Sequence, residues 1–441
     1  MTTTKIMAQI VLATSLCGSP AFATDNSEIK SLRNEFNNIK NSYERRISDL
    51  ENKLDKNNSI LNNTTTRNIY DNKFNPSIGV ILNGKYSSFS KKTSEIAGFG
   101  IGEEGERGKE GFSIDESELN FSSNIDDKFF GRLTAAIVNE DGSDIIELEE
   151  AFIRTSPEFG LPTGLEIKAG RAFWNLGYLN SKHAHADDFA DRPLTYRAFL
   201  NNGFNDDGSQ ISYILPTDIY AEIGGGTFRG DDFPFGGGDG TGSYSAYAAI
   251  GGDIGNNQNW RLGLSTLVGE AKTGRITNEN RVAFIGDSDL YIVDLKYVFA
   301  PTGNAKNQEL TLQGEYFYRS ESGNYEETNE GSSALTGEVN FNDKSSGWYL
   351  QTIYKFQPQW RLGLRYSELL TPNTPAGLIG SSLDSNNHDP KSYTAMIDWS
   401  NSEFSRIRIQ YNHEELSKNY HDNQIILQYV MSFGAHSAHK Y

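Results

Sequence analysis

Cysteine is almost absent from this sequence, which contains a single one, Cys17. It falls in a segment with the features of an export signal: Lys5 supplies a positive charge, residues 6–18 are mainly apolar, and a small-residue cleavage site ends at Ala23. We therefore expect a signal peptide over residues 1–23, cleaved after Ala23. The exported chain then has no thiol, which excludes disulfides, thiolate metal sites and cysteine-based catalysis.

Long hydrophobic runs are absent as well. After the signal segment, no stretch of about eighteen apolar residues occurs, so we expect no transmembrane helix. The mean hydropathy is negative, which is compatible with a transmembrane β-barrel because its strands are apolar only at alternate positions. The 43 glycines and the 12% of aromatic residues suit turns and interfacial girdles better than a helical core.

Positive charge is also scarce. The chain has 40 basic against 58 acidic residues, a formal net charge of -18, and this argues against a nucleic-acid partner because phosphates call for lysine and arginine. An acidic surface instead suits contact with cation-bridged lipopolysaccharide, or a cation-tolerant pore. Neither G-x-S-x-G nor H-E-x-x-H occurs, and we expect no enzymatic activity. The run from Gly100 to Gly105 matches the dinucleotide fingerprint but lacks its βαβ context, so we interpret it as an external loop.

One helical segment is expected, over residues 24–61. Apolar residues from Ile29 to Tyr43 recur at a three-four spacing, and those from Ile47 to Leu61 continue the seam after one four-residue step. Because Lys, Arg, Glu and Asn fill the other positions, such a helix needs partners, and we predict a periplasmic coiled coil. The alternative is a solitary amphipathic helix lying on the barrel or the cell wall. Residues 62–75, rich in Asn and Thr, are expected to form a linker.

From residue 76 onward the apolar period changes to two. Trp348, Leu350, Thr352 and Tyr354, for example, alternate with polar residues. Segments of about ten residues with one apolar face and aromatic ends are typical of lipid-facing strands, whereas the strands of a soluble β-sandwich are usually shorter. We predict an all-β transmembrane barrel over residues 76–441. Its sixteen antiparallel strands are expected at 77–89, 112–125, 128–140, 144–156, 163–174, 208–215, 217–229, 243–253, 258–269, 288–300, 306–319, 346–356, 359–368, 391–400, 404–415 and 421–433.

The connections between these strands form two sets of different length. The set expected on the outside is mostly long, and the other set consists of short turns, which is the asymmetry of outer-membrane barrels. The external loops are expected at 90–111, 140–143, 175–207, 230–242, 270–287, 320–345, 369–390 and 416–420.

The third external loop, residues 175–207, is the candidate functional segment. In a barrel wide enough to hold water, a long loop at this place can fold into the lumen and narrow it. We predict that its polar and charged side chains form the pore constriction. These are His183, His185, Asp187, Asp188, Asp191, Arg192 and Arg197.

The same loop carries candidate metal ligands. His183, His185 and Asp187 offer borderline donors that suit zinc. We expect no resident cofactor beyond a transiently held zinc ion, and the alternative is that the histidines are hydrogen-bonded polar lining without metal. The other histidines are His388, His413 and His421, expected near the external mouth, and His436 and His439 at the carboxyl end.

Strand alternation also places charged residues on the inner wall. The acidic members belong to the second and fourth strands, and most basic members belong to later strands. Opposed charges across a pore create a transverse field that orients polar solutes, although mutual salt bridges that fill the lumen are an equal alternative. The predicted lumen residues are Arg132, Arg261, Arg361, Arg365, Arg406, Arg408, Glu116, Glu118, Glu147 and Glu149.

The chain resembles the phosphate-selective porin O and P superfamily in its strand plan, its expected coiled coil, its long third loop and the motifs at 111–119 and 167–171. The segments 183–189, 196–200 and 434–441 resemble a branch often labelled zinc-regulated or TonB-dependent outer-membrane protein. The resemblance implies a trimeric porin. It does not imply phosphate selectivity, which depends on inward lysines that this chain replaces with scattered arginines. The TonB-dependent label does not fit the size of this chain. Such receptors need a plug domain and a barrel of about 22 strands, whereas only a short expected coiled coil precedes the first strand here.

These observations predict an outer-membrane channel for passive diffusion of small polar solutes or ions. It would assemble as a homotrimer, contact outer-membrane lipid and lipopolysaccharide, and be constricted by residues 175–207. Two alternatives stay open. One is an outer-membrane metal-binding or zinc-uptake protein, and the other is a structural envelope anchor whose coiled coil contacts peptidoglycan while its barrel is plugged.

Overall fold

The computed structural model describes residues 76–434, apart from residues 93, 141–142, 238–239, 278–281, 328–337 and 382. The expected signal peptide, coiled coil and linker, over residues 1–75, lie outside the described residues, as do His436 and His439. None of the helices in the described ranges is long and apolar enough to cross a membrane.

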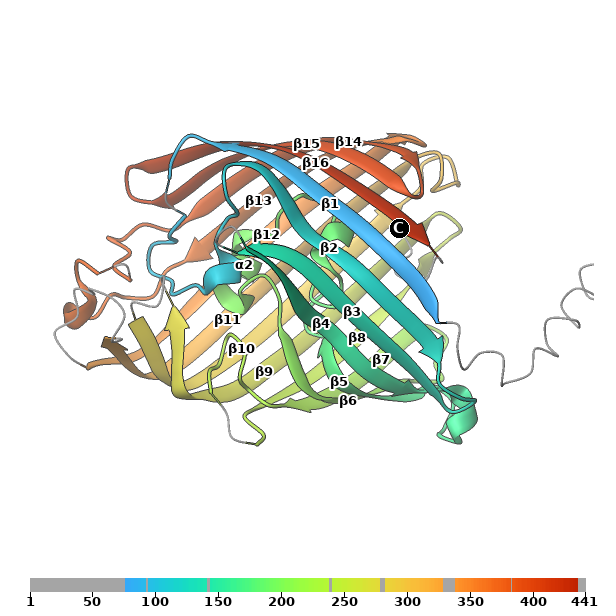
Figure 1. Ribbon diagram of the computed structural model, residues 1–441, viewed down its shortest axis with the longest axis horizontal. Helices are drawn as coiled ribbons and strands as arrows, with labels where there is room; N and C mark the ends of the chain where they lie inside the picture. Colours follow the sequence, from blue (N-terminus) through green and yellow to red (C-terminus); the bar gives the residue numbers. More distant parts are fainter. Residues whose placement is uncertain are drawn as a thin grey trace, which may run out of the picture. The chain divides into compact units, whose positions relative to one another are not determined.

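Across the described residues, sixteen antiparallel strands form one closed barrel in which each strand pairs with its neighbours along the chain (Figure 1). The ring closes where β1 pairs with β16, from Gly79 opposite Gly434 to Phe89 opposite Gln424. The strands are β1 (Ser77–Phe89), β2 (Gly111–Asn124), β3 (Phe129–Glu140), β4 (Ser143–Thr155), β5 (Leu165–Phe173), β6 (Asn205–Ile214), β7 (Tyr220–Phe228), β8 (Ser243–Ile254), β9 (Gln258–Thr277), β10 (Val282–Phe299), β11 (Glu309–Glu327), β12 (Val339–Gln357), β13 (Trp360–Leu370), β14 (Lys391–Ser402), β15 (Ser405–Ser417) and β16 (Tyr420–Gly434). The predicted sixteen-strand antiparallel barrel is thereby confirmed.

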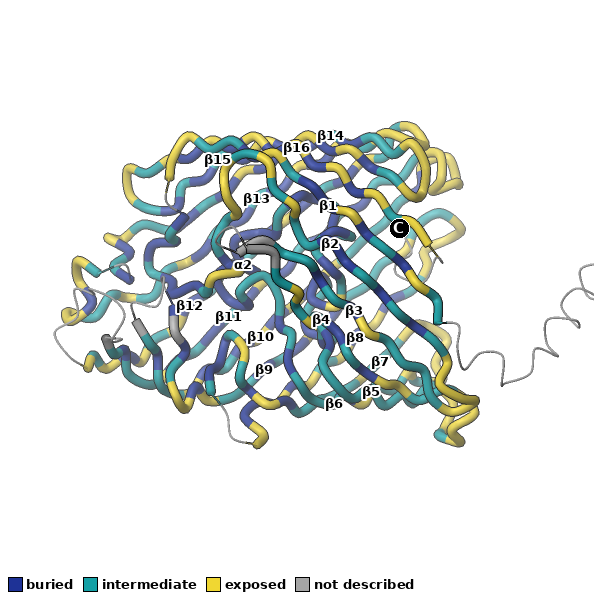
Figure 2. The backbone as a smooth tube through the Cα atoms, in the orientation of Figure 1, coloured by how far each residue is buried: buried dark blue, intermediate teal, exposed yellow. Residues whose placement is uncertain are grey.

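The strands expose apolar side chains outward and bury polar ones inward. On β16, Leu427 and Tyr429 are exposed, whereas Gln424 and Gln428 are buried. Figure 2 shows the same alternation of buried and exposed residues along other strands. This pattern inverts that of a water-soluble protein, and it is the one required when lipid surrounds the barrel.

The expected loops 270–287 and 320–345 are wrong in their extent. β9 continues to Thr277 and β10 begins at Val282, while β11 continues to Glu327 and β12 begins at Val339. The physical reason is a separate apolar cluster that packs these strand ends together and gives them a core of their own. Its members are Ala271, Phe284, Tyr325, Phe341, Leu378 and Leu383.

The third loop runs from β5 to β6 and contains the short helices η4 (Ala184–Ala186) and α2 (Leu194–Leu200). Every residue of α2 is buried, and this helix contacts β11, β12, β13 and η2 (Glu103–Gly105). Figure 1 shows α2 within the ring of strands. Phe199 stacks on Phe317 of β11 with ring centroids 5.7 Å apart. The largest apolar cluster among the described residues therefore lies inside the barrel, between this loop and the wall.

Candidate functional site

Basic side chains of the later strands hold the acidic side of the third loop. Arg361 of β13 donates to Asp188 over 2.7 Å and, through two other nitrogens, to Asp398 of β14 over 3.0 and 2.6 Å. Arg365, four residues further along β13, binds the carboxylate of Asp191. Burial alone would raise the pKa of Asp188, but the Arg361 guanidinium outweighs it and brings that pKa down to about 2.

The arginines of β15 hold the main chain of the same loop. Arg406 donates to the carbonyl oxygen of His185 over 2.7 Å, and Arg408 donates to that of Asp187 over 2.9 Å. Both arginines are buried. Backbone carbonyls fixed in this way set the positions of the side chains on η4, so this row of charges shapes the loop as well as lining the wall.

Three of the predicted constriction residues pair with charged partners, two of them within the loop and one on the wall. Arg192 donates to the carboxylate of Asp187 over 2.9 Å and to the carbonyl oxygen of Lys182 over 2.5 Å. Arg197 donates to Glu414 of β15 over 3.0 Å. Asp187 is thus paired with an arginine and does not join the two histidines that the sequence analysis grouped with it.

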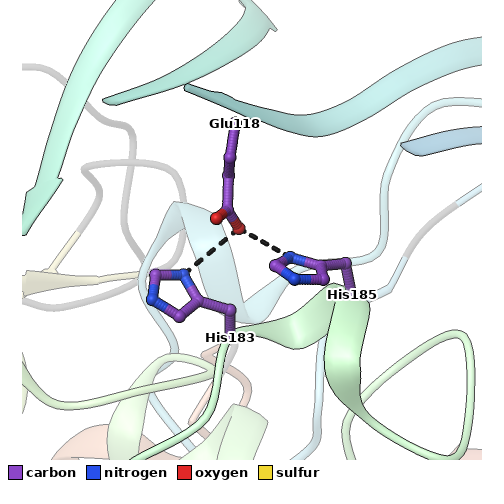
Figure 3. A group of neighbouring side chains, drawn as sticks. All are labelled: Glu118, His183 and His185. Carbon is purple, nitrogen blue, oxygen red and sulfur yellow. Dashed lines mark ion pairs between the residues drawn. The ribbon is translucent and has the colours of Figure 1, made fainter. Parts of the chain in front are cut away.

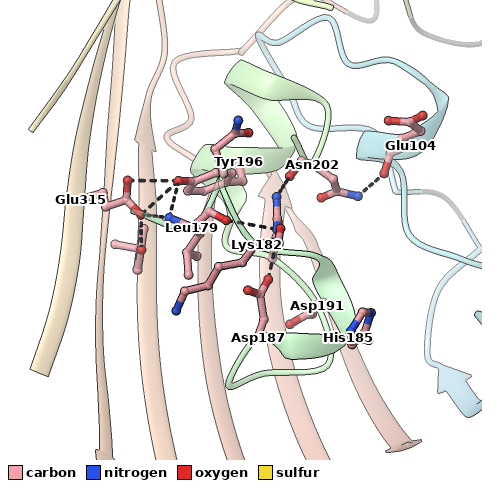
Figure 4. A network of polar contacts seen from close by, with 12 residues as sticks. Glu104, Leu179, Lys182, His185, Asp187, Asp191, Tyr196, Asn202 and Glu315 are labelled. Atoms are coloured by element: carbon pink, nitrogen blue, oxygen red, sulfur yellow. Dashed lines mark hydrogen bonds and ion pairs between the residues drawn. The ribbon is translucent and has the colours of Figure 1, made fainter. Parts of the chain in front are cut away.

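A buried carboxylate on β11 anchors the beginning of the loop. Glu315 accepts hydrogen bonds from the backbone N–H of Tyr178 at 2.9 Å and from the hydroxyl of Tyr349 at 2.5 Å. It also accepts one from the hydroxyl of Tyr196 at 3.1 Å (Figure 4). This residue was not predicted from the sequence. Its signal was available, because Glu315 lies two positions from Gln313 and therefore shares the inward face of β11 with it.

The two loop histidines lie against the acidic part of the wall, formed by β2 and β4. His185 Nδ1 lies 2.6 Å from Glu118 Oε1, and His183 Nδ1 lies 3.2 Å from the same oxygen (Figure 3). His183 Nδ1 also lies 3.3 Å from Glu149, and its Nε2 donates to Glu150 over 3.0 Å. Both imidazoles are buried. The structure therefore brings together two predicted constriction residues, two predicted lumen residues and Glu150, which was not predicted.

Two β-bulges create this gathering of carboxylates. On β2 the register against β1 shifts between Asp115 and Glu118, and on β4 the register against β3 shifts between Leu148 and Glu150. An extra residue in one strand reverses which side chains face inward beyond it. Glu149 and Glu150 therefore both approach His183, although strict alternation predicts that adjacent residues face opposite sides.

On this part of the wall, carboxylates surround His183 and also lie close to one another. Burial alone would lower the pKa of His183, but the charge of Glu118 and hydrogen bonds to the neighbouring carboxylates raise it well above its usual range. Glu116, Glu118 and Glu149 place one carboxylate oxygen each within 4.8 Å of one another. Arg132 lies 3.6 Å from Glu150, and the predicted lumen residue Glu147 is half-buried.

A cavity of about 210 Å³ remains beside the loop, against β7–β10. Tyr178 and Lys182 line it from the loop, and Arg261 and Asp294, which pair with each other, line it from the wall. Lys296 adds a further positive charge, since its Nζ donates to the Tyr178 hydroxyl over 2.6 Å. The cavity is polar and bordered by charges of both signs.

A second group of histidines lies on the hairpin of β15 and β16. His413 Nε2 lies 3.5 Å from Glu415, and His421 Nδ1 lies 3.7 Å from the same oxygen. The two rings are stacked with centroids 5.9 Å apart. His388 is near them, because its Nε2 lies 2.9 Å from the carbonyl oxygen of Glu415. Unlike the loop histidines, His421 is exposed.

Comparisons with known proteins identify the fold. No family model matches the chain. A protein of Aquifex aeolicus (strain VF5) described as uncharacterized is 29% identical over 399 residues, which cover 83% of this chain and 80% of that protein. The anion-selective porin from Comamonas acidovorans aligns with a TM-score of 0.50 and 12% identity, covering 81% of this chain and 99% of that one. Pseudomonas putida OprB aligns with a TM-score of 0.50 and 10% identity, covering 84% and 96%. The chain has the fold of outer-membrane porins.

Proposed function

We propose that this chain is an outer-membrane porin-type channel through which small polar solutes or ions diffuse passively. The observation that carries the proposal is the polar cavity left beside the third loop inside a closed barrel, with Lys182 and Arg261 on its border. A lumen that held no polar passage would favour the envelope-anchor alternative. The proposal assigns no catalytic residue.

The third loop is proposed to set the size limit of the passage. Its anchors lie on two separate parts of the wall: Glu118 on β2 faces the histidines, and Arg361 and Arg365 on β13 bind its aspartates. Charge-assisted hydrogen bonds on both sides hold a loop more firmly than neutral ones. Many of the charged residues that were predicted to create a transverse field therefore bind the loop instead. The open passage is proposed to lie beside β7–β10, where the cavity is.

The charges beside the cavity favour a modest preference for anions. Lys182 and Arg261 balance Asp294 and Glu222 on the cavity lining, and Lys296, which binds the hydroxyl of the lining residue Tyr178, adds a third positive charge. Glu222 also accepts hydrogen bonds from Tyr220 and Tyr247. Charges within a Debye length of about 8 Å act on a passing ion more strongly than the acidic excess of the distant loops. This proposal replaces the cation tolerance that the overall charge suggested.

Two finer assignments are also proposals. The motifs at 111–119 and 167–171 support kinship with the phosphate-selective porin O and P superfamily, without its phosphate selectivity. The apolar seam over residues 24–61 supports a homotrimer with a periplasmic coiled coil, since a helix with such a seam needs partners. Sizing of the full mature chain in mild detergent tests the oligomer, and a monomer would contradict it.

Swelling of liposomes tests the channel proposal. Vesicles that contain the purified, folded chain should swell in isotonic solutions of small polar solutes, and the rate should fall as the solute grows. Vesicles with the heat-unfolded chain are the control. A folded chain that gives no more swelling than this control would contradict the proposal and favour the plugged envelope anchor.

A further inference from the structure

The group around Glu118 has the donor set of a buried divalent metal site. The ligand atoms of Glu118, His183 and His185 all lie within 4.8 Å of one another, as do those of Glu116, Glu118 and Glu149. The two groups share Glu118. Imidazole nitrogen and carboxylate oxygen are the donors that zinc takes in proteins that offer no thiolate.

The two contacts of His183 Nδ1 match the spacing of neighbouring ligand atoms around four-coordinate zinc. Bonds of about 2.0–2.2 Å to the metal place two tetrahedral ligand atoms about 3.3–3.6 Å apart. His183 Nδ1 lies 3.2 Å from Glu118 Oε1 and 3.3 Å from Glu149 Oε2. The 2.6 Å contact of His185 with Glu118 is a hydrogen bond, and it needs to lengthen by about 0.7 Å for both atoms to bind one metal.

The surroundings of His183 provide an independent observation. Its second ring nitrogen, Nε2, donates to Glu150, and the same Glu150 oxygen accepts from the hydroxyl of Thr134 over 3.1 Å. Histidines that bind metals through one nitrogen regularly donate through the other to a carboxylate, which fixes the ring and its tautomer. The Nδ1 atom is left directed at Glu118 and Glu149, where the metal would sit.

Charge supplies a third argument. Glu118 and Glu150 are buried and Glu149 is nearly so, with side chains 0%, 7% and 11% exposed. Buried carboxylates in contact are costly unless cations compensate them. Arg132 lies 3.6 Å from Glu150, and a protonated His183 is the other positive charge in contact with these carboxylates. A divalent ion among Glu118 and Glu149 would supply two positive charges where they are needed most.

We propose that Glu118, Glu149, His183 and His185 bind one divalent transition-metal ion, of which Zn²⁺ is the representative, and that this ion pins the third loop to the wall formed by β2 and β4. The ligands come from the loop and from strand positions 34 or more residues earlier in the sequence, so the metal joins the two. The binding itself is independent of the proposed channel, whereas the pinning of the constriction rests on that function.

Metal analysis of the full mature chain, refolded with Zn²⁺ and then dialysed, tests the proposal. All variants are made in an H413A/H421A background, which removes the exposed histidine pair of the β15–β16 hairpin. We expect one zinc per chain in this background and none in H183A/H185A. Co²⁺ in place of zinc should give the intense visible absorption of four-coordinate cobalt, and this band should also vanish in H183A/H185A.

Two further variants keep the test decisive if the double substitution prevents folding. E118Q preserves the shape of a buried ligand and should abolish the cobalt band. E150Q leaves all four ligands in place and should keep one zinc per chain while weakening affinity about 10–100-fold. Equal zinc in the background chain and in a folded H183A/H185A or E118Q variant would overturn the site. One zinc per chain in the background and none in E118Q, together with equal conductance of these two chains, would leave the site standing and contradict the pinning.

Discussion

Arg361 on β13 lies 2.7 Å from Asp188 in the third loop, although 173 positions separate them in the sequence. The guanidinium also binds Asp398, so it joins the loop to two strands at once. Both members of the loop contact are only partly exposed, at 21% and 26%. The firmness of the proposed constriction therefore depends on a small number of such contacts.

Substitution of this pair should loosen the loop by different amounts. D188N leaves Arg361 paired with Asp398 and should cost about 1–2 kcal/mol of loop docking. R361A removes the arginine from Asp188 and leaves Asp398 only its 3.7 Å contact with Arg408, so it should cost more, about 3–5 kcal/mol. Both variants should conduct more noisily than the wild type in planar bilayers, R361A more so. D253N, on an exposed position of β8, is the control. Quiet channels in R361A would show that the loop is held without this contact.

The Asp191 anchor should depend on pH only in acid. Burial alone would raise the pKa of Asp191, but Arg365 and hydrogen bonds from its neighbours outweigh this and lower it. A carboxylate whose pKa is depressed in the folded state contributes its stabilisation fully above the ordinary aspartate value near 3.9, and loses it as the pH falls below. The conductance difference between the wild type and D191N should therefore stay constant from about pH 7 to pH 5 and shrink below about pH 4. A difference that disappears near neutral pH would contradict this anchor.

Ion selectivity should respond to the lysine beside the cavity. K296Q removes a positive charge whose Nζ lies 2.6 Å from the Tyr178 hydroxyl, so the reversal potential in a salt gradient should move towards cation preference. K306Q, on an exposed turn, is the matched control and should leave the potential unchanged. Equal potentials for K296Q and the wild type would place the ion path elsewhere.

The barrel was predictable from the sequence because strand alternation is a local property. The polarity of residues such as Leu427 and Gln428 indicates which side of the wall they face, even when their neighbours in space are not known. The extended ends of β9–β12 were not predicted, because their stability comes from the apolar cluster of Phe284 and Phe341 with a distant loop. Contacts between segments that are far apart in the sequence produce no periodic pattern in either segment.

The partners of the loop were harder to predict than the loop itself. His183 and His185 stand out as a motif, but Glu150 becomes their neighbour only through the bulge on β4. The sequence does contain a sign of that bulge. The apolar residues Ile146 and Leu148 face outward at even positions, whereas the next outward apolar residue, Ile153, is at an odd position. Asp187, two residues after His185 in the sequence, pairs with Arg192 instead of joining the histidines.

Single-channel recording of the purified, folded chain in planar bilayers tests the central claim most directly. The wild type should give stable ionic steps, and a variant in which a short glycine-serine linker replaces residues 176–203 should give larger steps, because the proposed constriction is gone while the barrel wall is intact. Absence of steps from the folded wild type, or equal steps from both chains, would contradict a channel that the third loop narrows.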